Sequence, residues 1–253
     1  MTFSIIASNK NRTEFGIAIC SAIPFIGKYS AFVFPNIGVI ASQGKVDPVT
    51  AYTIRSCLSD NLEASDILSY LEKKDPSFQR KQLTFLNLKN HKFYGYTGND
   101  LKVSKIDNSE IFGDIIFGDD FVVSGNCLVS LDTLKVMKDS FIKNNTLPLD
   151  LRILEALKAG NSLTGDYRGR QSASLYYFNS NFDYPIRTID VDEHKDPVIE
   201  LERIFYYATE HWQNVVNYCF FDMNFKRKYM TGPDFPEEIA KSISKLSKPV
   251  RER

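Results

Sequence analysis

The sequence predicts a four-layer αββα sandwich, in which two antiparallel β-sheets pack face to face and helices cover both outer faces. The first observation is the order of the expected elements: strands, a pair of helices, strands, a second pair of helices, strands and a further helix. The second is the composition, since 253 residues with 43% hydrophobic and 25% charged side chains can bury one large core. We therefore expect one sandwich domain over residues 1–232, followed by a C-terminal helix and tail over residues 233–253.

Strands are expected first along the chain, and two helices follow them. The first two β-prone runs flank a polar turn at residues 9–13, and the next two flank Pro35 and Asn36. Pro48 suits a first helical turn, and apolar residues then recur at helical spacing. The expected strands are residues 3–7, 15–21, 31–34 and 37–42, and the helices carry Ala51, Ile54 and Leu58, then Ile67, Leu68 and Leu71.

The second half of the chain continues this alternation. Ser130 is expected to cap one helix, and the next helix is expected to end at Gly160, because glycine is a good C-terminal cap residue. A later helix is expected to begin at Asp196 and Pro197. The expected strands are residues 83–88, 92–96, 121–123, 173–178 and 186–191, and the helices carry Leu131, Leu134, Met137 and Phe141, then Leu151, Leu154 and Leu157.

Charge and composition exclude several classes of function. Lys plus Arg equals Asp plus Glu at 31 each, so the chain lacks the basic excess that nucleic-acid binding needs. The four cysteines are scattered among apolar neighbours without a CxxC spacing, which predicts neither a disulfide framework nor a zinc site. No apolar run has the length of a secretory signal or a membrane span, so we expect a cytoplasmic protein with no membrane partner.

The stretch GDYRGRQSAS, residues 165–174, joins many hydrogen-bonding groups to a β-prone run. It contains a carboxylate, two arginines, a glutamine and two serines, with little side-chain bulk. One interpretation is a charged turn in solvent, and the other is a polar pocket at a strand end where a ligand binds. The direct continuation into a buried strand favours the pocket, and the stretch does not identify the ligand.

Four blocks of sequence together resemble a known family. They are MTFSIIAS at the start, SGNCLVS at 124–130, GDYRGRQSASL at 165–175 and VDEHKDPVIELERI at 191–204. Over residues 2–208 the chain resembles the bacterial family catalogued as domain of unknown function 1028, which is grouped with the N-terminal-nucleophile hydrolases. The resemblance implies an αββα fold and a hydrolase ancestry, while the family's substrate is not established. Residues 101–120 look longer and more charged than in the family, and the C-terminal tail looks private to this chain.

Thr2 is the catalytic residue that the resemblance implies. In an N-terminal-nucleophile enzyme the first residue of the mature chain attacks an amide carbonyl, and its own α-amine is the base. A free α-amine has a pKa of about 8, which is close enough to working pH to accept the hydroxyl proton. Met1 has to be removed first, and a small second residue permits this. The alternative is that Thr2 is only a β-prone residue at the start of a strand.

Residues 124–126 are expected in a turn between a strand and the helix capped by Ser130. Backbone N–H groups and the Asn126 amide would then be donors for the oxyanion of a tetrahedral intermediate, and Gly125 would allow close approach. In the resembled superfamily a small-residue turn of this kind lies beside the nucleophile. The alternative is a helix cap at Asn126.

Ser42 and Gln43, at the end of another strand, are expected either to line the same pocket or to form a turn before Pro48.

The resemblance also gives roles to the loop before the late strand. Asp166 would orient or pair with the α-amine or an arginine, and Arg170 would present its guanidinium to a carboxylate. Gln171 and Ser172 would face the pocket or fix the loop. The alternative is an internal network of Asp166 and Arg170 without a ligand.

The acidic segment after this strand predicts no metal site. Asp190, Asp192, His194 and Asp196 alternate and could share one face of an extended segment. A solvated strand edge with an N-cap at Asp196 is the favoured explanation, so we predict neither a metal nor a cofactor. The predicted function is an amide hydrolase or acylase acting on a small metabolite, in a homodimer or higher homo-oligomer. The alternative is a non-catalytic protein on the same fold that binds a small molecule or self-associates.

Overall fold

The computed structural model describes residues 2–106, 108–163, 168–182 and 185–212, together with residues 237, 239 and 241. The chain divides into two compact units, residues 1–201 and 202–253, and both sheets lie in the first unit. The predicted boundary between residues 232 and 233 lies outside the described residues. In the part of the chain that the structure describes, no helix is long and apolar enough to cross a membrane.

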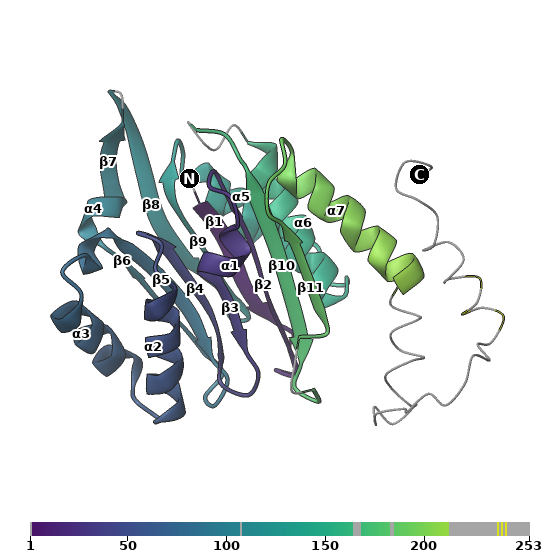
Figure 1. The fold of residues 1–253 in the computed structure, drawn as a ribbon, viewed down its shortest axis with the longest axis horizontal. Helices are drawn as coiled ribbons and strands as arrows, with labels where there is room; N and C mark the ends of the chain where they lie inside the picture. Colours follow the sequence, from purple (N-terminus) through teal and green to yellow (C-terminus); the bar gives the residue numbers. More distant parts are fainter. Residues whose placement is uncertain are drawn as a thin grey trace. The chain divides into compact units, whose positions relative to one another are not determined.

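The first strand, β1, is the central strand of a seven-stranded sheet (Figure 1). The strand order is β11-β10-β2-β1-β9-β8-β7, and every neighbouring pair is antiparallel. The strands are β1 (Thr2–Ser8), β2 (Glu14–Ser21), β7 (Val103–Ile106), β8 (Ser109–Phe117), β9 (Phe121–Leu128), β10 (Ser172–Asn179) and β11 (Arg187–Val191).

A four-stranded antiparallel sheet of order β3-β4-β5-β6 packs against the first sheet. Its strands are β3 (Ala31–Phe34), β4 (Gly38–Gly44), β5 (Lys81–Asn87) and β6 (Lys92–Thr97). Helices α2 (Pro48–Ser59) and α3 (Ala64–Lys74) cover its outer face, and α5 (Asp132–Lys143) and α6 (Leu149–Ser162) cover the outer face of the large sheet. The expected αββα sandwich is therefore the observed fold.

Shorter elements complete the described chain. Helix α1 (Ile26–Ser30) follows β2 and contacts β10, β3 and β4, and no helix was expected at this position. The other elements are the 3-10 turn η1 (Phe78–Arg80), helix α4 (Asn99–Lys102), helix α7 (Pro197–Tyr207) and the π-helical segment η2 (Ala208–Trp212). The charged region after residue 100 thus forms α4 and the β7–β8 edge of the large sheet.

Apolar side chains from both sheets form the layer between them. Ile6, Ile17 and Ile19 of the large sheet are fully buried against Val39 and Leu86 of the small sheet. Burial of an aliphatic side chain of this size contributes about 1.5–3 kcal/mol to stability. Side chains alternate along a strand, so the face of β1 that carries Ile6 also carries Thr2 and Ser4.

Gly160 differs from its expected role as a helix terminus. Helix α6 continues to Ser162, and Gly160 lies inside it. An added Cβ at Gly160 would lie 2.8 Å from the Cγ and Sδ of Met137 on α5 and 3.1 Å from Phe3 on β1. The glycine therefore permits close packing of α6, and the prediction of a C-terminal cap was wrong.

Lys81 is buried on the outer face of the small sheet. Its side chain is 1% exposed, and its Nζ lies 2.7 Å from Asp47 Oδ2, 2.6 Å from Asp75 Oδ2 and 2.5 Å from Thr50 Oγ1. Asp47 also caps α2 by accepting a hydrogen bond from the Val49 amide, and Asp75 directly follows α3. The Lys81 ammonium thus holds the start of one helix and the end of the next against β5.

Removal of the Lys81 charge is expected to destabilise the protein strongly. In Lys81→Met, two carboxylates would remain close together without their counter-ion, a loss of about 3–5 kcal/mol for a buried pair. Urea unfolding monitored by circular dichroism measures this. The control is Lys135→Met, which removes a charge paired with Asp132 on the exposed surface of α5. An equally stable Lys81→Met protein would contradict the role given to Lys81.

The cluster of Lys81, Asp47 and Asp75 predicts that the stability of the protein depends on pH. Burial alone would raise the pKa of the Asp75 carboxyl, but hydrogen bonds from Lys81 and Ser77 outweigh burial and lower it to about 2. A carboxyl whose pKa is lower in the folded state stabilises the fold above its unfolded pKa of about 4, and this contribution is lost as the pH falls. The stability advantage of wild type over Asp75→Asn should therefore shrink between about pH 4 and pH 2 in urea titrations. A constant difference over that range would count against the assignment.

Candidate functional site

Polar side chains replace the apolar core at one end of the layer between the sheets. We call this set the polar strip. It forms because strands from both sheets carry hydroxyl and carboxamide side chains on their inner faces near the same rim, and all of these side chains are buried. Its members are Thr2 and Ser4 on β1, Ser21 on β2, Gln43 on β4, Gln82 and Thr84 on β5, and Ser124 and Asn126 on β9.

Thr2 lies at the rim of the polar strip, in the central strand of the large sheet. It stands directly opposite Ser21 on one neighbouring strand and opposite Asn126 on the other. Its Oγ1 lies 2.9 Å from Ser21 Oγ, within hydrogen-bond distance, and the residue is 6% exposed. Both neighbouring strands therefore hold the Thr2 backbone, and Ser21 holds its hydroxyl.

Gln82 and Asn126 join the two sheets beside Thr2. The Asn126 Nδ2 donates to Gln82 Oε1 at 3.2 Å, and Gln82 Nε2 donates to the Gly125 carbonyl at 2.9 Å. Sequence reasoning missed Gln82, because the strand was expected to begin at Leu83. The signal was a polar residue at every second position, Gln82 and Thr84, in front of the apolar end of β5.

Gln43 lies deeper in the strip, directly opposite Gln82 on the neighbouring strand. Its Nε2 donates to Ser124 Oγ at 2.7 Å and to Ser4 Oγ at 3.1 Å, and these two hydroxyls are 3.0 Å apart. The Gln43 side chain is fully buried, and its Oε1 has no hydrogen-bond partner among the described residues. A buried polar group without a partner costs about 1–3 kcal/mol.

Residues 124–126 do not form the expected turn. They lie within β9, where Ser124 and Asn126 face the polar strip and Gly125 faces the opposite side. An added Cβ at Gly125 would lie 3.1 Å from Leu134 Cδ2 on α5 and 3.2 Å from the Thr2 carbonyl oxygen. Cys127, the next residue, has a φ of 54°, a left-handed conformation that is unusual for a residue other than glycine. The strand is irregular at this point, and it continues to Leu128, which pairs with Phe112 on β8.

The hydroxyls of Ser42 and Ser172 hydrogen-bond to backbone groups outside the polar strip. The Ser42 side chain is on the outer face of β4, where its Oγ donates to the Asp47 carbonyl at 3.4 Å. Ser172 stands opposite Ser21, and its Oγ bonds to the backbone of Ile23 and Ile26 before and in α1. Ser172 thus fixes the β2–α1 connection.

The loop before β10 reaches the rim through its backbone. The Gln171 amide donates to the Ser21 carbonyl at 2.7 Å, which places residue 171 beside the strand that carries Ser21. The Arg170 Nη2 donates to the carbonyl of Leu163, the residue after α6, and its Nε is buried without a partner among the residues that the structure describes. Asp166 lies outside the described residues.

The comparisons with known proteins identify the family. The family described as "Family of unknown function (DUF1028)" matches residues 2–201. The chain belongs to this family. The matched range coincides with the first compact unit. No curated protein matches the chain.

Among solved structures, a protein of the same family shares the fold of this DUF1028 chain, and two others have a weaker similarity to it. The crystal structure of a DUF1028 protein from Silicibacter pomeroyi has a TM-score of 0.75 at 22% identity, and the match covers 91% of this chain and 99% of that one. Anbu (ancestral beta-subunit) from Yersinia bercovieri has a TM-score of 0.42 at 10% identity, with coverage of 82% and 94%. A mutant Anbu from Hyphomicrobium sp. strain MC1 has the same TM-score and identity, with coverage of 83% and 95%.

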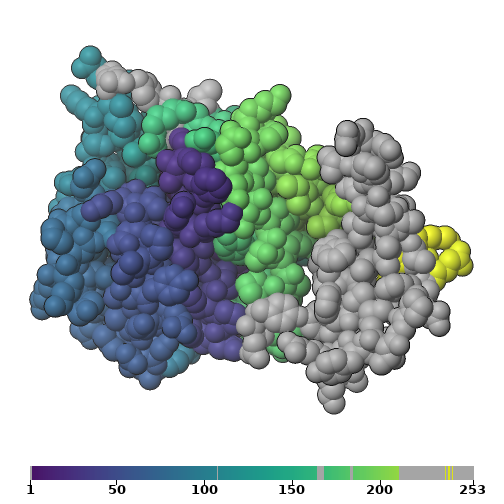
Figure 2. All heavy atoms as spheres, in the orientation of Figure 1, coloured from purple at the N-terminus to yellow at the C-terminus, as the bar shows by residue number. Residues whose placement is uncertain are grey.

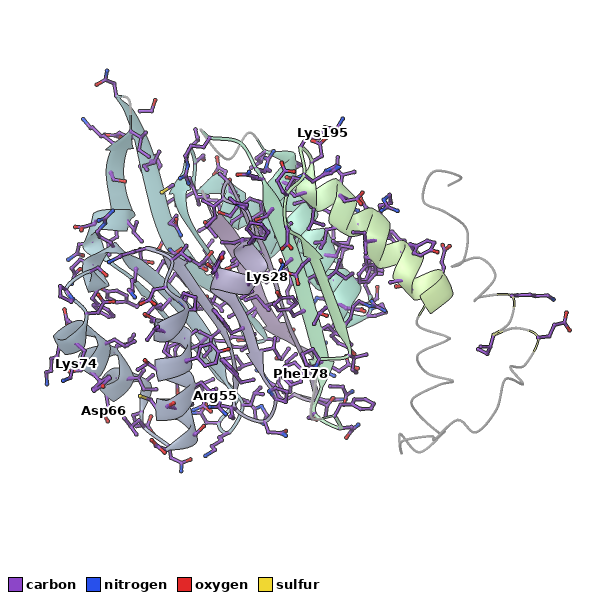
Figure 3. All side chains as sticks on the ribbon, in the orientation of Figure 1. Lys28, Arg55, Asp66, Lys74, Phe178 and Lys195 are labelled. Atoms are coloured by element: carbon purple, nitrogen blue, oxygen red, sulfur yellow. The ribbon has the colours of Figure 1, made fainter. Side chains whose placement is uncertain are left out.

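In the acidic segment of the DUF1028 chain, Asp190 and Asp192 bind donors of the protein itself. Asp190 Oδ1 accepts hydrogen bonds from Ser174 Oγ at 2.6 Å and from the Tyr176 hydroxyl at 2.7 Å. Burial and the Asp190 charge raise the pKa of Tyr176. Asp192 pairs with Lys28, which Figure 3 labels on α1. Among the described residues no group of three or more His, Cys, Asp or Glu side chains could hold a metal ion.

A cavity of about 540 Å³ lies between the start of α2 and the end of α3. Figure 2 shows this part of the surface in blue, and Figure 3 labels Lys74 at its edge. Asp47, Thr50 and Asp75 line the cavity, and no residue of the polar strip does. Its two carboxylates, Asp47 and Asp75, are both paired with Lys81 Nζ, which also bonds to Thr50 Oγ1.

Arg170 is expected to tolerate substitution less well than Arg168. Arg170→Lys keeps the charge but loses the planar guanidinium that reaches the carbonyl at the end of α6, and a lost contact of this kind costs about 1 kcal/mol. For a protein of this size that corresponds to a fall in melting temperature of about 2–4 °C. Differential scanning calorimetry of Arg170→Lys and Arg168→Lys measures it. Equal melting temperatures would show that residues 168–170 form only a charged turn.

Proposed function

We propose that this DUF1028 protein is an amide hydrolase or acylase acting on a small metabolite, with Thr2 as its nucleophile after removal of Met1. The observation that carries the proposal is the position of Thr2. Once Met1 is removed, Thr2 is the first residue of the chain. Its hydroxyl then lies at the rim of the sandwich, on a residue that stands opposite Ser21 and Asn126. The fold of the N-terminal-nucleophile hydrolases has the same αββα layers.

The chemistry needs a base, and the chain supplies one at Thr2 itself. After Met1 removal the α-amine of Thr2 accepts the proton of its hydroxyl, either directly or through Ser21 Oγ at 2.9 Å. The Thr2 oxygen attacks the amide carbonyl carbon, the C–N bond breaks, and the amine leaves with the transferred proton. Water then hydrolyses the ester on Thr2 and releases the acid.

Asn126 is the proposed donor to the oxyanion. Its amide faces the same side of the sheet as Thr2 on the neighbouring strand. One N–H of Nδ2 donates to Gln82 Oε1, so the side chain is held in place while the second N–H is available for the substrate. A donor that is already oriented needs little reorganisation as charge develops on the carbonyl oxygen.

A nucleophile at Thr2 can be tested without knowing the substrate. Intact-mass measurement of the purified protein is expected to show the loss of Met1. A β-lactone probe opens by hydroxyl attack on its carbonyl, so peptide mass spectrometry should find the whole probe added to Thr2. Thr2→Ala should abolish labelling, because it removes the attacking oxygen and keeps the small side chain.

The matched control is Thr53→Ala, which removes an exposed hydroxyl on α2 and should leave labelling unchanged. Retained Met1, or equal labelling of Thr2→Ala, would overturn the proposal. The competing function is then a non-catalytic protein that binds a small molecule. The expected homo-oligomer stays a prediction, which light scattering of the purified protein measures.

A further inference from the structure

The carbonyl oxygen of Gln43 is an unused acceptor inside the polar strip. Gln43 is 0% exposed, and both contacts of its side chain are made by Nε2, to Ser4 and Ser124. Its Oε1 has no partner among the described residues. Since buried polar atoms are almost always hydrogen-bonded, this oxygen calls for a donor from outside the fold.

The orientation of the amide follows from its surroundings. If the amide were turned round, Oε1 would accept from the two serine hydroxyls and Nε2 would be left without a partner. That orientation would leave two N–H donors without hydrogen-bond partners, whereas the observed one leaves a single acceptor without a partner. Gln43 Nε2 therefore bonds to Ser4 and Ser124, and the free group is the carbonyl oxygen.

The surroundings of this oxygen are neutral. All side chains of the polar strip are hydroxyls or carboxamides. The nearest buried ammonium along β5, that of Lys81, lies on the outer face of the strand and is paired there with two carboxylates. A charged group beside Gln43 would lose its hydration without gaining a counter-ion among these side chains.

We propose that Gln43 Oε1 binds a neutral N–H donor on the acyl side of the ligand, so that the substrate carries a terminal carboxamide or ureido group. The inference rests on the proposed function at Thr2. Ser4, which contacts Gln43, lies two residues from Thr2 on the same face of β1, a spacing of about 7 Å along a strand. A short acyl chain would therefore reach from a carbonyl at Thr2 to an amide at Gln43.

Binding to the Thr2→Ala variant tests this separately from catalysis. Three coumarin anilides serve as probes: those of succinamic acid, of succinic acid and of its monomethyl ester. They differ only in whether the chain ends in a carboxamide, a carboxylate or an ester without N–H. We expect the carboxamide to bind about tenfold more tightly than the other two by fluorescence anisotropy, because only it donates to Gln43.

Two substitutions of Gln43 test whether the preference for the carboxamide depends on this residue. Gln43→Met removes the acceptor at similar volume and should abolish the preference for the carboxamide. Gln43→Glu keeps an acceptor and adds a charge, so it should shift the preference towards the 4-aminobutyryl anilide, which ends in an ammonium group. Circular dichroism checks that each variant is folded.

Equal affinity for the three probes in the Thr2→Ala protein would overturn the inference, and so would the absence of binding. Selective binding that depends on Gln43 would support it even if the β-lactone fails to label Thr2. In that case the proposed catalysis fails and the ligand class stands. If the β-lactone labels Thr2 but the three probes bind equally well, the proposed catalysis stands and the ligand class fails.

Discussion

A shift of β1 by one residue against β9 would turn Thr2 and Ser4 out of the layer between the sheets and place Phe3 and Ile5 there. The register therefore decides which side chains meet at the rim. It is fixed from both faces. Phe3 and Ile5 are fully buried on the helix side, and Ile6 is buried between the sheets. The apolar residues of β1 thus place its hydroxyls.

The layer between the sheets changes from an apolar core to a hydrogen-bonded network over a few residues of each strand. On β4, Val39 and Ala41 pack into the core, while Gln43, one step further on the same face, bonds to serines of the opposite sheet. A carboxamide can span the gap between sheets and satisfy partners on both sides, as Gln82 does with Thr97 on β6 and with Gly125 and Asn126 on β9. Its polar atoms would otherwise be costly to bury. The sheets are therefore joined at the rim by directional bonds, which hold a site more rigidly than apolar contact does.

The layers of the fold could be predicted from the periodicity of apolar residues in the sequence. The residues of the site could be predicted from it only in part. The αββα order could be predicted because alternating strands and helical stripes each leave a mark in the sequence. The inner face of β4 could not be chosen from the sequence, because Ser42 and Gln43 are both polar and only the opposite sheet distinguishes them. Gly160 is a second case. A helix end and a close helix contact both favour glycine, and only the position of Met137 separates the two.

The central position of β1 has a consequence for chemistry at its first residue. The ends of a chain usually fray, because few contacts hold them. Thr2 is the exception here, since ladders with both β2 and β9 extend to this residue and its hydroxyl bonds to Ser21. A terminal nucleophile has to be held within a fraction of an ångström of its working position to contribute fully. A strand at the edge of a sheet would hold its first residue from one side only. The central strand therefore supplies the rigidity that the nucleophile proposed at Thr2 requires.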